Sequence, residues 1–214
     1  MSMFPDIKFR DCDPNLARRL KKDLVSVESH LLDCSPSNFS RQKLGRIRIR
    51  IFKFPRNEEC NEFFLLHRNK RYVCLNSSLL TRRYYTGLQH TLHGIAHHFS
   101  QFRDEIGDEV FCEFISYSIL NKLLEKRGRK FQNRIIRSVM RSSPRDYNIY
   151  YRIGRKLNEK NEGFLIKLNN MVKNRKISTK KEKKLFSRVL KTKIKGQNFS
   201  IKEVPELERG FRKV

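Results

Sequence analysis

Arginine and isoleucine alternate strictly from Arg46 to Ile51. Successive side chains of an extended chain point to opposite faces, so this pattern predicts a strand with isoleucine on a buried face and arginine in water. Two further runs, Phe63–His67 and Arg71–Leu75, are strand-like and are separated by residues 68–70, which predicts a hairpin. The sequence therefore predicts a small antiparallel or mixed sheet.

Helical periodicity occupies most of the remaining chain. Asp13 and Pro14 are typical of a helix start, and leucines follow at helical spacing to about residue 32. Further helices are predicted over about 80–101 and 108–127, the second of which ends at Gly128. We therefore expect an α+β fold in which the sheet packs on a two-helix core.

The amino-acid composition changes after residue 128. Residues 130–170 keep helical periodicity, whereas residues 171–195 hold eleven lysines and arginines against the single acid Glu182. This stretch is predicted to be a basic helix or a partly disordered tail. We expect a domain over residues 1–128 and a mainly helical, strongly basic extension over 129–214.

Four of the six histidines lie close together, at His90, His93, His97 and His98. His93 and His97 are four residues apart on a predicted helix, so both rings project from one face about one turn apart. With that spacing a helix offers two nitrogen ligands to one zinc ion. Glu109 and Glu113 follow one turn apart on the next helix. We expect one Zn²⁺ on the two histidines and one of these glutamates, the other glutamate orienting a histidine.

Three of these residues are also candidates for catalysis: Glu109, Glu113 and His90. Glu113 lies among apolar residues, where a charge is unfavourable unless it is paired. His90 shares the face of His93 and His97, as an outer group or a replacement ligand. The alternative is that the histidines are hydrogen-bonded groups on a helix half buried against the sheet, with no metal.

The histidine segment resembles the zincin metallohydrolases, particularly the gluzincin group. Residues 94–99 are similar to the H-E-x-x-H helix with glycine in place of its glutamate, and Glu109–Glu113 is similar to the E-x-x-x-D/E element of the second helix. The resemblance covers roughly residues 45–125 and implies a zincin-like core that holds zinc, beside a strand that receives extended substrate.

Gly94 stands where that family has its general base. The resemblance therefore implies little peptidase activity, and Gly94→Glu is expected to raise it. A weaker resemblance, to the YbeY endoribonucleases, retains the glycine: residues 93–97 match the opening of H-G-x-L-H, although their third histidine falls at Arg103. Two alternatives follow from Gly94. Hydrolysis is lost, or another carboxylate, such as that of Glu105, Glu109 or Glu113, acts as the general base.

The charge is large and unevenly spread. The chain carries a net charge of +26; residues 1–120 hold 19 basic and 14 acidic side chains, whereas residues 121–214 hold 29 and 8. Such an excess predicts attraction to polyanions, nucleic acid first and anionic membrane second. The weaker resemblance to RNA-acting enzymes makes RNA the expected nucleic acid before DNA. The expected nucleic-acid-binding residues are the cations of the basic stretch: Lys180, Lys181, Lys183, Lys184, Arg188, Lys191, Lys193 and Lys195.

Cysteine usage and hydropathy bound the protein's class. The five cysteines are odd in number and contain no C-x-x-C pair, which argues against a disulfide framework and a cysteine zinc site. No apolar run approaches the roughly 18 residues of a membrane span, and we expect an intracellular, cytoplasmic protein.

The sequence thus favours a nucleic-acid-associated zinc protein, a degenerate or weakly active metallohydrolase. The alternatives are a non-catalytic nucleic-acid or ribonucleoprotein-binding protein with structural histidines, or an active metal-dependent peptidase or endoribonuclease.

Overall fold

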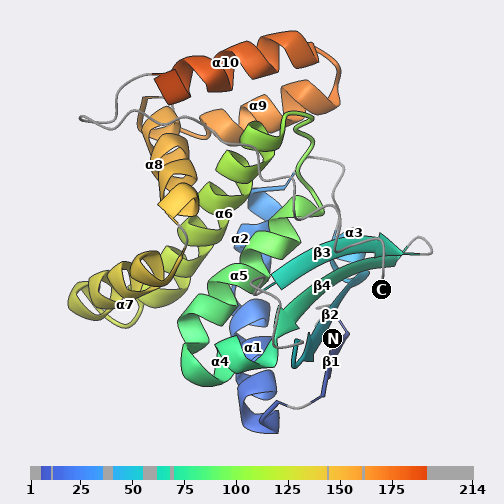
Figure 1. The fold of residues 1–214 in the computed structure, drawn as a ribbon, viewed down its shortest axis with the longest axis vertical. Helices are drawn as coiled ribbons and strands as arrows, with labels where there is room; N and C mark the ends of the chain where they lie inside the picture. Colours follow the sequence, from blue (N-terminus) through green and yellow to red (C-terminus); the bar gives the residue numbers. More distant parts are fainter. Residues whose placement is uncertain are drawn as a thin grey trace.

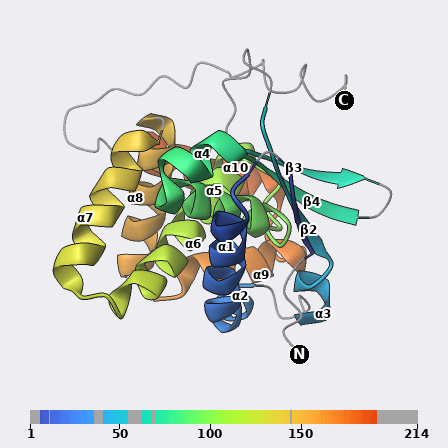
Figure 2. The ribbon, with the colours of Figure 1, turned by 90° about the horizontal axis from the view of Figure 1, so that it is seen from below.

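The computed structural model describes residues 6–10, 12–35, 41–54, 62–67, 70–143, 145–160 and 162–191. Figures 1 and 2 show a small sheet on one side of a body of helices. The strands are β1 (Ile7–Phe9), β2 (Ile47–Phe52), β3 (Glu62–His67) and β4 (Lys70–Asn76). The helices are α1 (Pro14–Ser26), α2 (Glu28–Asp33), α3 (Arg41–Leu44), α4 (Ser77–Arg82), α5 (Tyr84–His97), α6 (Glu105–Glu125), α7 (Arg129–Ser142), α8 (Arg145–Lys160), α9 (Phe164–Lys173) and α10 (Thr179–Lys191).

The predicted arginine–isoleucine strand is confirmed as β2. Ile47, Ile49 and Ile51 are buried, and Arg48 and Arg50 are half-buried on the other face. The guanidinium of Arg50 forms an ion pair with Asp6, with 3.0 Å between nitrogen and oxygen. Alternation alone therefore assigns the two faces of this strand correctly.

The expected antiparallel or mixed sheet on a two-helix core is corrected by the strand directions. The sheet order is β1-β2-β4-β3, in which β1, β2 and β4 form a parallel group. Among the described strands, only the edge strand β3 runs antiparallel to its neighbour, β4, as expected of the predicted hairpin. Parallel neighbours need a crossover, and α1, α2 and α3 form that connection between β1 and β2. The three-residue strand β1 is too short to give a periodic signal.

Two predicted helices are each divided in the structure. The helix expected to about residue 32 is split at Val27 into α1 and α2, and the one expected from about 80 is split at Arg83 into α4 and α5. Asp13 caps α1 as predicted, because its carboxylate accepts the N–H of Asn15 at 2.8 Å. Hydrophobic spacing continues through both breaks, so periodicity alone joins the paired helices.

Helix α6 is the centre of the helical body. One of its sides packs on α5, which covers the sheet, and α8 packs on another. At this second contact a Cβ on Gly154 of α8 would lie 2.6 Å from the Cβ of Phe114, so glycine lets the two helices approach closely. One apolar core extends from Ala17 to Phe186, across the predicted boundary at residue 128. The division into two domains stays a prediction.

The last two helices are held by the loop between α5 and α6. Asn169 of α9 accepts the N–H of Gln101 at 2.7 Å. Glu182 of α10, 1% exposed, accepts the N–H groups of Arg103 and Asp104, each at 2.8 Å. Asp104 is the N-cap of α6, so the Glu182 carboxylate lies near the positive end of that helix dipole. Figure 1 shows α9 and α10 together at this end of α6.

Glu182→Ala is expected to lower the free energy of unfolding by about 2–3 kcal/mol, because two buried N–H groups lose their acceptor. Glu182→Gln should have a smaller effect, since the amide oxygen can still accept. Urea unfolding followed by circular dichroism measures both, with Lys181→Ala, an exposed neighbour on α10, as the control. Equal stability of Glu182→Ala and the unaltered chain would show that this contact does not secure α10.

Candidate metal centre

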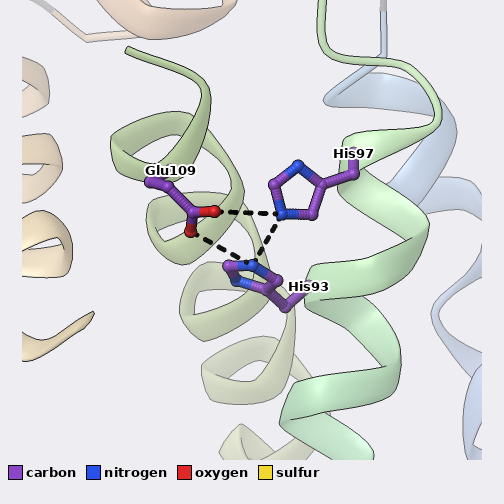
Figure 3. A group of neighbouring side chains, drawn as sticks. All are labelled: His93, His97 and Glu109. Atoms are coloured by element: carbon purple, nitrogen blue, oxygen red, sulfur yellow. Dashed lines mark hydrogen bonds and ion pairs between the residues drawn. The ribbon is translucent and has the colours of Figure 1, made fainter. Parts of the chain in front are cut away.

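Two histidines of α5 and one glutamate of α6 meet where these helices pack together (Figure 3). The Nε2 atoms of His93 and His97 lie 2.8 Å apart. One carboxylate oxygen of Glu109 lies 3.4 Å from Nε2 of His93, and the other lies 3.6 Å from Nε2 of His97. Their i, i+4 spacing on one helix brings the two imidazoles together, and the packing of α6 on α5 adds the carboxylate.

The donor atoms have the spacing of a metal site. Ligands at zinc distances in a tetrahedral arrangement lie about 3.3 Å from one another, and the separations here are 2.8, 3.4 and 3.6 Å. The His93 ligand is shielded from water, at 3% exposed, whereas Glu109 is half-buried. These three residues could hold a metal ion.

The second nitrogen of each histidine faces a carboxylate. Nδ1 of His97 lies 2.8 Å from Asp108, and Nδ1 of His93 lies 3.0 Å from Glu113. Glu113 also accepts a hydrogen bond from the Gln89 side-chain amide at 3.2 Å. Such contacts direct both Nε2 atoms toward the common point, as the outer carboxylates of metal-binding histidines do.

The charged groups of the site stabilise one another against burial. Burial opposes a proton on His93, but the carboxylates of Glu113, Glu62 and Glu109 outweigh it and raise the pKa of His93 well above its usual value. Burial likewise opposes ionisation of Glu109, yet its contacts with His93 and His97 lower its pKa. For Glu113 burial dominates and raises the pKa. The negative field that favours a proton on His93 also favours a metal cation in its place.

Strand β3 forms a further wall of the site. The Oε1 atom of Glu62 lies 3.9 Å from Nε2 of His93 and 3.3 Å from Nδ1 of His90. The ring of Phe64 stacks on that of His97, with centroids 4.0 Å apart. His90, a catalytic candidate, thus contacts Glu62, and Glu62 in turn lies near the Nε2 donor atom of His93.

A second group of possible ligands consists of His97, Asp108 and Cys112. Burial and the neighbouring carboxylates raise the pKa of the Cys112 thiol well above its usual value, but a metal ion would deprotonate a thiol that coordinates it. The Nδ1 contact with Asp108 directs the other ring nitrogen of His97 toward Glu109. Both groups could therefore hold a metal ion.

Gly94 faces the sheet rather than the donor atoms. A Cβ at this position would lie 2.8 Å from Cγ1 and 3.3 Å from Cγ2 of Val73, a fully buried residue of β4. The absence of a side chain therefore lets α5 lie against β4. The expectation that Gly94→Glu would raise peptidase activity does not agree with this packing, because the new carboxylate would enter the core.

His98 lies outside the candidate metal centre, and its Nε2 contacts the backbone oxygen of Tyr72 at 2.8 Å. Burial, together with the charges of Arg71 and His97, lowers its pKa to about 4 although the Tyr72 contact opposes this. Between pH 4 and the unfolded value near 6.5, the unfolded chain therefore binds more protons at this residue. Stability is expected to fall as the pH falls through this window.

His98→Gln should remove this contribution, because glutamine does not titrate and its amide can still donate to Tyr72. When the pH is lowered from 7 to 4, the free energy of unfolding should fall in both proteins. The fall should be smaller in the variant than in the unaltered chain by on the order of 3 kcal/mol. Urea titrations across this range measure the difference. Parallel pH profiles for both proteins would contradict a buried, neutral His98.

The predicted nucleic-acid-binding residues are only partly described. Lys180, Lys181 and Lys184 are exposed on α10. For Lys183, Arg188 and Lys191 the structure describes the backbone but not the side chain. Lys193 and Lys195 lie outside the described residues. No described contact brings the exposed lysines to the metal centre.

Sequence reasoning missed Glu62 and the role of Asp108. Glu62 precedes a predicted strand far from the histidines in sequence, and only the sheet brings it beside α5. Asp108 is adjacent to Glu109. A loop separates it from His97, and the sequence does not predict the path of that loop. A local signal existed for Asp108, since it belongs to the acidic run that follows the histidines.

No family model, curated protein or solved structure matches this chain. Over the described residues, no helix is both long enough and apolar enough to cross a membrane.

Proposed function

We propose that this protein binds one zinc ion through His93, His97 and Glu109, as a zincin-like centre. The observation that carries the proposal is that each histidine directs Nε2 to a common point and has a carboxylate, Glu113 or Asp108, at Nδ1. Outer carboxylates of this kind set the tautomer and orientation of zinc-binding histidines. Imidazole and carboxylate donors suit zinc, and three protein ligands are typical of catalytic sites with one open position.

Weak metal-dependent hydrolysis is the activity that we assign to this centre. Zinc in such a position supplies a Lewis acid and lowers the pKa of a bound water. Glu62 is the carboxylate best placed to accept a proton, because its Oε1 lies 3.9 Å from Nε2 of His93. It takes the role that Gly94 cannot perform, and His90 positions its carboxylate through the 3.3 Å contact.

A second candidate function is a non-catalytic metal site, and burial favours it. The side chains of His93 and His97 are 3% and 2% exposed, and that of Glu109 is 22% exposed. A metal ion here would join α5 to α6 and stabilise the core in the way of a structural site.

The charge of the chain supports association with nucleic acid, and the expectation of RNA before DNA rests on the weaker resemblance of residues 93–97 to the YbeY endoribonucleases. Residues 121–214 carry 29 basic against 8 acidic side chains, and residues 1–120 are themselves slightly basic. The excess therefore has no matching acidic region within the chain. An anionic partner would reduce the resulting self-repulsion and release counter-ions on binding.

Glu62→Gln tests the hydrolytic role. Zinc-loaded protein is expected to cleave casein or structured RNA slowly, and the substitution should lower the rate about 10²–10⁴-fold while the zinc content stays unchanged. Glu105→Gln, an exposed carboxylate on α6, is the matched control and should have no effect. If zinc raises the melting temperature but neither substrate is cleaved, the non-catalytic candidate is correct. If no zinc is bound, both functions fail.

A further inference from the structure

We propose that the outer face of α7 is the binding site for single-stranded RNA. This inference rests on the nucleic-acid association proposed above and gives it a location. A groove of about 1040 Å³ lies along this helix, and six cations line it: Arg127, Arg129, Lys130, Arg134, Arg137 and Arg141. In both views α7 is on the side of the helical body away from the sheet (Figures 1 and 2).

The cations form a continuous row. Lys130, Arg134, Arg137 and Arg141 follow one another at spacings of four, three and four residues, which places them on one face of α7. Arg127 lies in the turn before the helix and lines the same groove. The four cations on the helix extend for about 16 Å along its axis, with a cation roughly every 5 Å. Such a row follows a chain of phosphates rather than a single anion.

Among the described residues, no acid neutralises the row. All six lining cations are exposed, and α7 contains no aspartate or glutamate. Within the described part of the chain, none of the six belongs to an ion pair. Their charge is therefore directed to the solvent, where an anionic partner can meet it.

An aromatic ring lies within the same groove. Phe131 is half-buried there, and the guanidinium carbons of Arg127 and Arg134 lie 5.9 and 5.2 Å from its ring centroid. A cationic groove that also offers aromatic and guanidinium faces is typical of proteins that bind single strands, because unpaired bases stack on such faces. Asn133 and Ser138 in the same lining supply hydrogen-bonding groups for a ribose 2′-hydroxyl. These groups favour single-stranded RNA over a duplex.

The opposite face of α7 anchors the groove. Val139 is 1% exposed, and Ile135, Ile136 and Met140 pack against the apolar core. The ring of Phe131 also contacts Tyr85 of α5, edge to face, at 6.2 Å. Because one face is held by the core, charge changes on the outer face should leave the fold intact.

The test compares two full-length variants that each lose three positive charges. One is Arg134→Gln, Arg137→Gln and Arg141→Gln on α7; the other is Lys180→Gln, Lys181→Gln and Lys184→Gln on α10, where the sequence alone places the binding residues. Fluorescence anisotropy measures binding of an unstructured RNA oligonucleotide over a salt series from about 50 mM. The α7 variant should flatten the slope of log K against log[salt] by about two, since each lost single-strand phosphate contact contributes roughly 0.7. The α10 variant should flatten the slope less than the α7 variant.

The outcomes separate this inference from the proposed association. RNA binding that is weakened equally by both variants, or only by the α10 variant, overturns the α7 site and leaves the association standing. No binding by the unaltered chain at about 50 mM salt overturns both. Equal affinity for DNA of the same sequence overturns the choice of RNA. Arg134→Lys, Arg137→Lys and Arg141→Lys keeps the charge and should retain the slope, and circular dichroism confirms that each variant is folded.

Discussion

His97→Ala is expected to abolish zinc binding. The unaltered protein should bind one zinc ion per chain, and the variant should bind none, because it loses one of two nitrogen donors that lie 2.8 Å apart. Zinc should stabilise the unaltered protein by about 2.7 kcal/mol at a hundredfold excess over Kd, and this gain should vanish in the variant. Metal analysis after gel filtration and thermal unfolding with and without zinc measure the two effects.

Two further substitutions sharpen this experiment. Asp108→Asn should keep the stoichiometry but lower zinc affinity about 10–100-fold, because Nδ1 of His97 loses its carboxylate. His30→Gln, a histidine of α2 near Asp33, should bind zinc as the unaltered chain does. Full zinc content in His97→Ala would refute the assigned ligand set. If the unaltered chain contained no zinc, the histidines would be purely structural.

Gly94→Glu is expected to destabilise the protein by about 3–5 kcal/mol, the range of an uncompensated charge in a core. The added Cβ would lie 2.8 Å from Val73, and the carboxylate would follow it into the core where α5 meets β4. The variant should therefore show reduced solubility or a lower urea midpoint. A stable Gly94→Glu protein with raised hydrolytic activity would refute the packing described here and support the unmodified zincin resemblance.

A double-mutant cycle with uncharged substitutions measures the packing of residue 94 against Val73. Gly94→Ala alone should destabilise, because overpacking of about 1–3 kcal/mol exceeds the gain of about 1 kcal/mol in helix propensity. In a Val73→Ala background the space for the new methyl group exists, so Gly94→Ala should become neutral or stabilising. Chemical unfolding of the four proteins gives the coupling energy. Equal effects in both backgrounds would show that Val73 does not restrict residue 94.

Within each helix, the sequence by itself determined which residues share a face. Backbone geometry repeats every 3.6 residues, so the spacing of His93 and His97 places both rings together, and Glu109 and Glu113 are likewise neighbours on α6. The same local logic predicted β2 and the β3–β4 hairpin. The charge of residues 121–214 is also a property of the sequence alone.

The tertiary structure alone decided how these faces meet. Glu109 and Glu113 are one turn apart on one helix, so only the offset of α6 along α5 places Glu109 at the Nε2 atoms and Glu113 at Nδ1 of His93. The contact of Glu62 with His90 depends on the pairing of β3 with β4, and the capture of the loop before α6 by Glu182 depends on the chain's return through α8, α9 and α10. Local periodicity contains no information on such distant contacts, because they follow from how all the apolar faces pack into one core.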